Sequence, residues 1–447
     1  MHVMHGDRGA DEANGIERAA MRKIAVRLVP FLAAMFFVNF LDRTAISFAG
    51  PNGLTHDFGM TAAQFGFAAG IFFIGYIGLG IPSNLALHKF GARRWLASIM
   101  VCWGVISLLF TWVSSVPQLY LLRFLLGVAE AGFAPGAFLF LSSWSPERYR
   151  SRILGLFYIA QPLTIVIGAP VASLLIGMDG AFGLAGWRLM FFGVAIPAII
   201  IGFVTWFFLA DKPGEARWLT SAERDWLTAE LEAEDLAKSD RRHRVGEALC
   251  APRVWLFALI YFGLVYGLYA LTFFLPTIIA GFEAQFGSRF DVFQKGLITA
   301  IPYLPAALVL FAWSQATRKG VQGWHISLPA AVGALSIPCA LYMNSPGAAV
   351  AIITVTACAI FAALPVFWAL PTQTLSGAGA AAGIALINAV GNIGGFAAPY
   401  ITGAVKDATG SYASPMSIVG GFLLLSAVLA IFMTAVPKQA NDGAVIP

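Results

Sequence analysis

Twelve long apolar segments are the feature of this sequence that most limits its fold. They cover about residues 24–50, 62–86, 94–113, 117–142, 151–178, 187–209, 253–281, 292–314, 325–343, 347–369, 379–404 and 414–436. A helix needs roughly 20 mainly apolar residues to cross a bilayer, and only helices or closed barrels satisfy their backbone polar groups in lipid. The segments lack the alternation of barrel strands. We therefore predict an all-α membrane protein with 12 transmembrane helices in the lipid bilayer.

The composition agrees with that class. Of the 447 residues, 59% are hydrophobic and 11% are charged, whereas soluble domains carry about 25% charged residues. The net charge of +5 fits basic cytoplasmic loops better than nucleic-acid binding. The four cysteines and six histidines have no metal-type or disulfide-type spacing, and the sequence contains no nucleophile–base set or phosphate loop. We expect no enzyme, no metal and no nucleic-acid partner.

Basic connections predict how the helices are oriented. Lys and Arg gather at 87–94, 146–152, 316–320 and in the long connection 210–252, and such loops face the cytoplasm. Both termini are then cytoplasmic. The expected order along the chain is a cytoplasmic segment 1–23, a six-helix bundle 24–209, a cytoplasmic linker 210–252, a second six-helix bundle 253–436 and a cytoplasmic tail 437–447.

The linker contains WLTSAERDWLTAELEAED, which predicts a short amphipathic helix on the protein or on the membrane surface. Thr220 and Glu223 have the spacing of a capping box. The two bundles echo each other weakly in HKFGARRW (88–95) and TRKGVQGW (317–324). Such a duplication suggests a transporter whose substrate site lies near the midplane, between the halves.

Two adjacent charges interrupt the first segment, in FFVNFLDRTAISFAG (36–50). The uncharged run 28–41 would be about 21 Å long as a helix, against roughly 30 Å of hydrocarbon. The helix must therefore continue past Asp42 and Arg43, which places them within the membrane at a cost on the order of 2.5–3.5 kcal/mol each. With Asn39 they have i, i+3, i+4 spacing, and we expect all three on one face.

The fourth segment carries a second charged pair, in LLRFLLGVAEAGFAPG (121–136), where Arg123 and Glu130 lie two helical turns apart. Four buried charges are either two structural salt bridges or a functional set. We favour function, because buried ion pairs rarely stabilise better than apolar packing and membrane-embedded charges usually mark functional sites.

Arginine stays protonated, whereas carboxyl groups can bind protons. The set of four is neutral with both acids ionised and +2 with both protonated. Proton binding and anion binding would then favour each other by the same factor, as symport of H⁺ with an organic anion requires.

The second half offers amides and aromatic rings in place of central charges. Trp368, Thr372 and Gln373 lie near the end of one helix, and Asn388 and Asn392 lie one turn apart on the next. Each amide alone is more typical of helix–helix contact than of ligand binding. We raise Asn388 above that, and we count Thr372 among the substrate-binding candidates.

Several stretches together resemble the anion:cation symporter family of the major facilitator superfamily: FLDRTAISFA, GYIGLGIPSNLALHKFGARRW, RFLLGVAEAGFAPG, GLYALTFFLPTII and GIALINAVGNIGGFAAPY. The resemblance covers about residues 24–436. It implies two six-helix bundles, alternating access, and H⁺-coupled uptake of a sugar acid, hydroxy-dicarboxylate or aromatic carboxylate across the bacterial inner (plasma) membrane. Protons would be the coupling ion, with no other cofactor.

The resemblance also implies roles for single residues. Asp42 and Glu130 would be the protonation sites, and Arg43 would couple them. Arg123 would hold the substrate carboxylate. Further substrate contacts would come from Tyr76, Gln161, Trp368 and Asn388.

Three positions depart from the family's pattern. His88 and Thr317 stand where an acid often precedes the basic residue of a cytoplasmic turn, which puts the usual gate contacts in doubt. Phe40 stands where many members have Tyr, which weakens the case for a polyhydroxy sugar acid and slightly favours a less polar or aromatic acid. An exporter or antiporter and a non-transporting sensor remain alternatives. No pattern sets the oligomeric state, and we expect a monomer.

Overall fold

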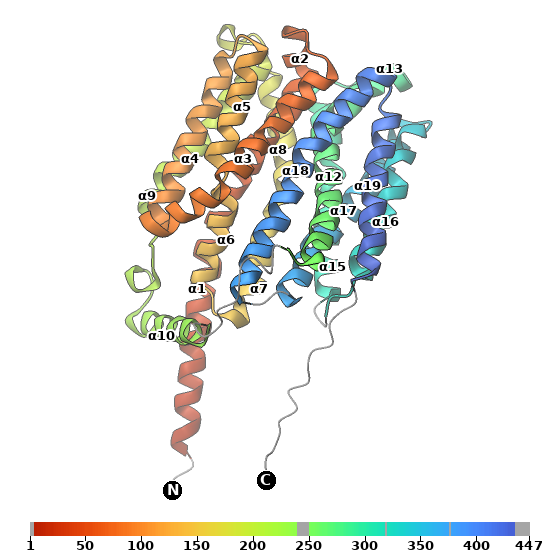
Figure 1. The fold of residues 1–447 in the computed structure, drawn as a ribbon. Helices are drawn as coiled ribbons and strands as arrows, with labels where there is room; N and C mark the ends of the chain where they lie inside the picture. Colours follow the sequence, from red (N-terminus) through yellow and green to blue (C-terminus); the bar gives the residue numbers. More distant parts are fainter. Residues whose placement is uncertain (1–3, 239–249, 318–319, 375–376, 434–447) are drawn as a thin grey trace.

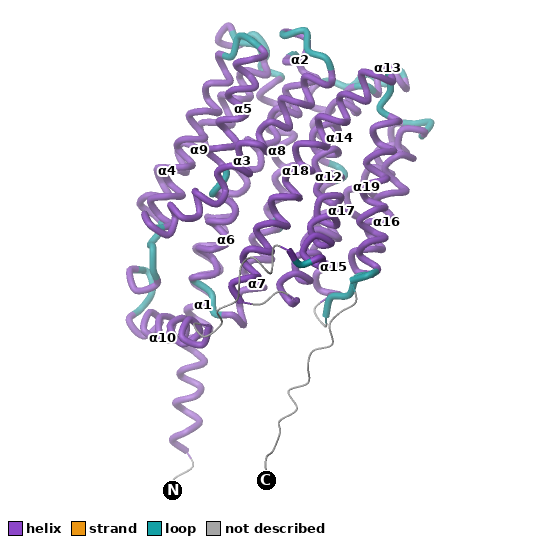
Figure 2. Tube along the Cα trace, viewed as in Figure 1, coloured by secondary structure: helices purple, strands orange, loops and turns teal. Residues whose placement is uncertain are grey.

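The computed structural model describes residues 4–238, 250–317, 320–374 and 377–433 (Figure 1). In these ranges, 12 helical spans are long and apolar enough to cross a membrane. No strand occurs in them, and helices joined by short loops make up the molecule (Figure 2). The predicted all-α fold with 12 spans is confirmed.

Six spans form each half of the chain, and three of the spans are built from two consecutive helices. The first half contains α1 (Met4–Ala49), α3 (Ala62–Phe90), α4 (Ala92–Leu109), α5 (Val116–Glu130) with α6 (Phe133–Ser143), α7 (Glu147–Tyr158) with α8 (Ala160–Ile176), and α9 (Gly186–Phe208). The second half contains α12 (Pro252–Ala280), α14 (Val292–Ala300) with α15 (Tyr303–Ala316), α16 (Trp324–Cys339), α17 (Pro346–Thr374), α18 (Gly377–Thr409) and α19 (Ala413–Ile431). Short helices α2 (Leu54–Asp57), α10 (Ser221–Lys238) and α13 (Phe282–Phe286) lie in the connections.

Helix α1 runs through Asp42 and Arg43 without a break and ends at Ala49. The span that contains it reaches from Gly15 to Asn52. The inference that the two charges lie inside the membrane-spanning helix, which came from the length of its apolar run, is therefore confirmed.

The two halves meet at the end of the molecule away from the start of α1 and the end of α19, which we call the closed end (Figure 1). There α3 lies against α18. A Cβ added at Gly66 would lie 2.1 Å from the carbonyl oxygen of Pro399, and one added at Gly403 would lie 2.0 Å from that of Ala62. Only glycine permits these approaches, so the two halves are in direct backbone contact at the closed end.

Asp407 of α18 adds a polar link to the same seam. Its carboxylate accepts hydrogen bonds from the backbone N–H groups of Ala62 (3.0 Å) and Ala63 (2.7 Å), at the first turn of α3. These N–H groups have no partner within their own helix. A residue of the second half therefore caps a helix of the first.

Helix α10 lies across α1 at the base of the first half (Figure 1). It begins with the predicted capping box: the Thr220 N–H donates to the Glu223 carboxylate at 2.8 Å, and the Glu223 N–H donates to the Thr220 hydroxyl at 3.3 Å. Glu223 also accepts a hydrogen bond from Lys23 Nζ of α1 at 2.7 Å. Arg148 and Arg150 of α7 pair with Glu230 (3.4 Å) and Glu234 (3.1 Å). Of the two placements expected for this helix, the structure shows the one on the protein.

The attachment of α10 should depend on the charge of Glu223. Burial alone would raise the pKa of Glu223, but the hydrogen bonds from Lys23 and Thr220 outweigh it and hold the pKa below its usual range. A carboxyl whose pKa is lowered by folding stabilises the fold above its unfolded pKa of about 4.3, and this stabilisation is lost as the pH falls through the folded pKa.

We expect Glu223→Gln to weaken the docking of α10 at pH 7 by about 1 kcal/mol, measured as faster amide hydrogen exchange in residues 221–234. Wild type should approach the variant only below about pH 4. Glu232→Gln, on the exposed side of α10, is the matched control. Equal exchange rates in wild type and Glu223→Gln at pH 7 would show that the contacts of Glu223 with Lys23 and Thr220 do not hold α10 in place.

Candidate functional site

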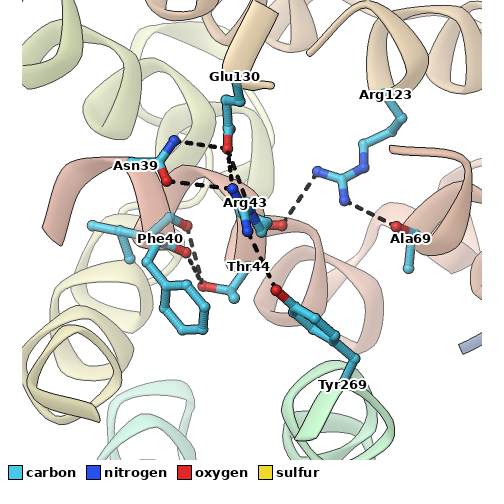
Figure 3. A network of polar contacts seen from close by, with 9 residues as sticks. Asn39, Phe40, Arg43, Thr44, Ala69, Arg123, Glu130 and Tyr269 are labelled. Atoms are coloured by element: carbon cyan, nitrogen blue, oxygen red, sulfur yellow. Dashed lines mark hydrogen bonds and ion pairs between the residues drawn. The ribbon is translucent and has the colours of Figure 1, made fainter. Parts of the chain in front are cut away.

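A buried ion pair joins α1 to α5 (Figure 3). Arg43 donates to Glu130 Oε2 through Nη2 at 3.0 Å and through Nε at 3.3 Å, and Asn39 Nδ2 donates to the same oxygen at 2.8 Å. Arg43 Nη1 also donates to the hydroxyl of Tyr269 on α12 at 3.3 Å. Glu130 is completely buried, and Arg43 is 6% exposed. We call Asn39, Arg43, Glu130 and Tyr269 the Arg43–Glu130 cluster.

Close helix packing brings Glu130 to this depth. One turn before it, Gly127 lies so near α3 that a Cβ there would be 1.9 Å from the carbonyl oxygen of Phe72. Helix α5 ends at Glu130 itself, and the chain resumes as α6 at Phe133. Glu130 therefore projects from the last turn of a helix that a glycine allows to sit directly against α3.

Two aromatic rings of α3 support the Arg43 guanidinium. Its Cζ lies 4.9 Å from the ring centre of Phe72 and 4.9 Å from that of Tyr76. The two rings are themselves stacked, with centres 5.8 Å apart. Such cation–π contacts strengthen when the cation is desolvated. The structure thus places Tyr76, one of the predicted site residues, beside the cluster.

The Asp42 side chain contacts α4 and does not hydrogen-bond the Arg43–Glu130 cluster in the described part of the chain. Ser107 of α4 donates a hydrogen bond to Asp42 Oδ1, and both residues are completely buried. Asp42 Oδ2 and Glu130 Oε1 have no hydrogen-bond partner in the described part of the chain. Of the three residues predicted to share a face, Asn39 and Arg43 both bond Glu130, whereas Asp42 bonds α4. Adjacent residues on a helix diverge by about 100°, so Asp42 and Arg43 contact different neighbouring helices.

Arg123 binds backbone in place of a carboxylate (Figure 3). Its Nε, Nη2 and Nη1 donate to the carbonyl oxygens of Ala68 (3.1 Å), Ala69 (3.2 Å) and Arg43 (3.3 Å). The side chain is 0% exposed. Within the described ranges, no carboxylate lies at ion-pair distance from it. The two-turn spacing to Glu130 therefore does not produce a salt bridge, and in this conformation Arg123 ties α5 to α1 and α3.

The other predicted residues lie on three further helices. Gln161 is buried on α8, and Trp368 of α17 packs edge-on against Tyr261, with ring centres 4.8 Å apart. Asn388 of α18 accepts hydrogen bonds from Asn392 Nδ2 through its backbone oxygen (2.9 Å) and Oδ1 (3.2 Å). In the described part of the chain, neither Gln161 nor Asn388 hydrogen-bonds the cluster. The side chain of Thr372 lies outside the described residues.

Two polar contacts of this region were not predicted. Tyr269 lies in the quoted stretch GLYALTFFLPTII, where its hydroxyl was the available signal. Ser107 lies in a run of apolar residues. A single hydroxyl in a transmembrane helix is common and usually bonds its own backbone, so nothing distinguished it in the sequence.

In the described ranges, twelve helical spans suited to cross a membrane, in two halves and with a buried ion pair between α1 and α5, are typical of a polytopic membrane transporter. The family model of the Major Facilitator Superfamily matches residues 32–399. The chain belongs to this superfamily, and the resemblance inferred from its motifs is confirmed.

Comparisons with individual proteins agree. The chain is 42% identical to a protein of Agrobacterium vitis named "putative tartrate transporter", over 96% of this chain and 94% of that one. It is 38% identical to the quinolone resistance transporter of Acinetobacter baumannii, over 94% and 96%. A bacterial homologue of the human lysosomal transporter Spinster, solved in an inward-facing and unoccupied conformation, matches with a TM-score of 0.73 at 18% identity, over 92% and 98% of the two chains. That structural likeness supports the fold, and the relatives identify a membrane transporter.

Arg123→Gln should act mainly on stability. It removes a buried charge that three carbonyl oxygens solvate, and hydrogen bonds to charged groups contribute about 1.5–3 kcal/mol each. We expect a loss on the order of 3 kcal/mol in the free energy of unfolding, measured as a lower Tm of the purified protein without ligand. Arg289→Gln, at an exposed site, is the control. An unchanged Tm for Arg123→Gln would mean that its three hydrogen bonds do not hold the helices together.

Proposed function

We propose that this transporter takes up a small organic anion together with protons, by alternating access. The observation that carries the proposal is the buried pair of Arg43 and Glu130, in which a permanent cation is held by a group that can bind a proton. A proton on Glu130 removes the negative charge that Arg43 pairs with. A substrate carboxylate can then take its place, with bidentate geometry that suits a guanidinium.

Coupling follows from this exchange of partners. The anion binds more tightly when Glu130 is protonated, and by reciprocity the anion favours the protonated carboxyl by the same factor. Arg43 donates to Tyr269 of the second half as well as to Glu130 of the first. If Arg43 changes its partner, its contacts with both halves change. Alternating access requires such a link between the halves.

Asp42 supplies the second proton-binding group in this proposal. It is buried with one neutral donor, Ser107, and no cation hydrogen-bonds its carboxylate in the described part of the chain. An ionised carboxylate in such surroundings is costly, and a bound proton removes that cost. With both carboxyls protonated, the four charged residues carry +2 and attract an anion.

Among anions, we place hydroxy-dicarboxylates first. A relative at 42% identity carries tartrate in its name. The rings of Phe72 and Tyr76 lie against the Arg43 guanidinium, which keeps aromatic acids as the next class. We further propose that the termini and the α10 linker face the cytoplasm of a bacterial inner membrane, on the grounds of the basic loops.

Export of a small molecule is the second candidate function. The quinolone resistance transporter, at 38% identity, supports it. Arg43 opposes a purely cationic cargo, because a buried guanidinium repels cations. The two functions can therefore be distinguished by the class of ligand that binds and by the pH dependence of its binding.

Ligand binding by the purified protein tests the anion and its link to protons. We expect one class among sugar acids, hydroxy-dicarboxylates and aromatic acids to raise the Tm, and to raise it more at pH 5.5 than at pH 7.5. Ligand at 100 times its Kd adds about 2.7 kcal/mol of stability. Arg43→Gln should abolish the shift, whereas Arg289→Gln should keep it. Stabilisation by quinolones alone, equal at both pH values, would reject the proposal in favour of export.

Glu130→Gln tests the proton coupling directly, in proteoliposomes. We expect loss of uptake driven by an inward proton gradient by at least about 100-fold, because the variant cannot bind the proton. Exchange of external for internal substrate needs no net proton movement and should continue. Glu283→Gln, at an exposed site away from the cluster, is the control. Proton-driven uptake that survives in Glu130→Gln would show that Glu130 is not a coupling site.

A further inference from the structure

One face of the span Ala92–Trp112, which consists of α4 and the 3-10 turn Phe110–Trp112 after it, carries polar groups buried in the interior of the first half. Trp103, Ser107 and Thr111 follow each other at four-residue intervals, so they lie on one side of the span, and all three are 0% exposed. The indole N–H of Trp103 and the hydroxyl of Thr111 have no hydrogen-bond partner in the described ranges. We call these three residues the α4 polar row.

Asp42 of α1 faces the middle of the row. Ser107 donates to its Oδ1, whereas its Oδ2 is buried and has no partner among the described residues. Three buried polar atoms, Trp103 Nε1, Thr111 Oγ1 and Asp42 Oδ2, therefore lack a partner among the described residues. Buried polar groups are nearly always hydrogen-bonded, to protein or to ordered water, and buried waters typically bind such unsatisfied groups.

The row leads towards the protein surface at the closed end. The backbone oxygen of Thr111 accepts a hydrogen bond from Arg188 Nη1 at 2.7 Å. Arg188 lies in the first turn of α9 and is partly exposed. Its neighbour Trp187 donates to Asp57 at 2.7 Å, and the side chain of Asp57 is 40% exposed. The outer end of the row is thus adjacent to solvent-accessible polar groups.

We propose that waters along the α4 polar row form a proton route between the closed end and Asp42, separate from the Arg43–Glu130 cluster. A hydronium proton passes along the waters and forms an O–H bond at Asp42 Oδ2, and no electron transfer is involved. Ser107 is a positioning residue that holds Oδ1 and leaves Oδ2 free to receive the proton. The role of this route in transport rests on the proposed function.

The charges around Asp42 fit such a separate route. Arg43 on α1 and Arg123 and Glu130 on α5 act on it through space. Helix α8, which packs against α1, carries no charged residue, and Arg188 is the one charged residue of α9. Arg43 contacts the second half, whereas Asp42 contacts α4 inside the first. The hydrogen bonds of the two carboxylates therefore run to different helices, from Ser107 of α4 to Asp42 and from Arg43 of α1 to Glu130.

Hydroxyl-radical footprinting tests the waters without any transport assay. Radicals generated by X-rays in bound water modify the side chains that the water touches. In the reconstituted full-length protein we expect Trp103 to be modified although it is completely buried, and Thr111→Val to lower its modification by about threefold through loss of a water-binding hydroxyl. Trp112, which is 59% exposed, reports the radical dose. Modified Trp112 with unmodified Trp103 would show that the row is dry and overturn the proposal.

Proteoliposomes test the transport role. We expect Ser107→Ala and Thr111→Val to slow proton-driven uptake about tenfold, the effect of one lost hydrogen bond of about 1.4 kcal/mol, and to move its pH profile, while substrate exchange stays within about twofold. Ser107→Thr should restore uptake, and Ser98→Ala, on an exposed part of α4, should change neither. An unchanged pH profile in Ser107→Ala and Thr111→Val would reject the route. If wild type shows no proton-driven uptake, the proposed function fails instead, and the footprint still decides whether the row is hydrated.

Discussion

The structure is organised around one interaction, the ion pair of Arg43 and Glu130 inside the membrane-spanning region. Either charge without a partner would be costly there, on the order of 2.5–3.5 kcal/mol. The pair requires α1 to continue past Arg43 and requires α5 to approach closely enough for Glu130 to reach it. Gly127 permits that approach, and Asn39, one turn before Arg43, completes the coordination of the shared Glu130 oxygen.

The two buried arginines are held by different chemistry, and this separates their roles. Arg123 is solvated by three backbone carbonyls, which do not titrate, so its bonds are the same at every physiological pH. Arg43 is held by a carboxylate, so its strongest contact depends on a proton. One arginine can therefore fix the helices α1, α3 and α5 relative to each other while the other changes partner. A site that relied on two carboxylate-paired arginines would lose its framework whenever it bound protons.

Local and length-dependent features could be predicted from the sequence, whereas the partners of the charged residues could not. The continuation of α1 past Asp42 followed from the length of an apolar run, and the Thr220–Glu223 capping box followed from a four-residue pattern. Which charges meet depends on how α1, α4 and α5 are rotated about their axes, and neighbouring sequence does not encode that rotation. The contact of Asp42 with α4 and the binding of Arg123 to backbone carbonyls were therefore not predicted. Ser107 and Tyr269 gave too weak a signal, since each adds one hydroxyl to an apolar helix.

The position of α3 suggests how the ion pair and the closed end could act on each other. Near its start, α3 is capped by Asp407 and lies in backbone contact with α18. Further along, Phe72 and Tyr76 of the same helix support the Arg43 guanidinium, and Ala68 and Ala69 bind Arg123. The single helix α3 therefore contacts α18 of the second half near its start and supports Arg43 through its aromatic rings further along. Because a helix moves largely as a rigid body, separating α3 from α18 would also displace the rings beneath Arg43. The contact between α3 and α18 at the closed end would then depend on what Arg43 binds. Movement of α3 itself would link the two sites, and no chain of contacting side chains between them would be needed.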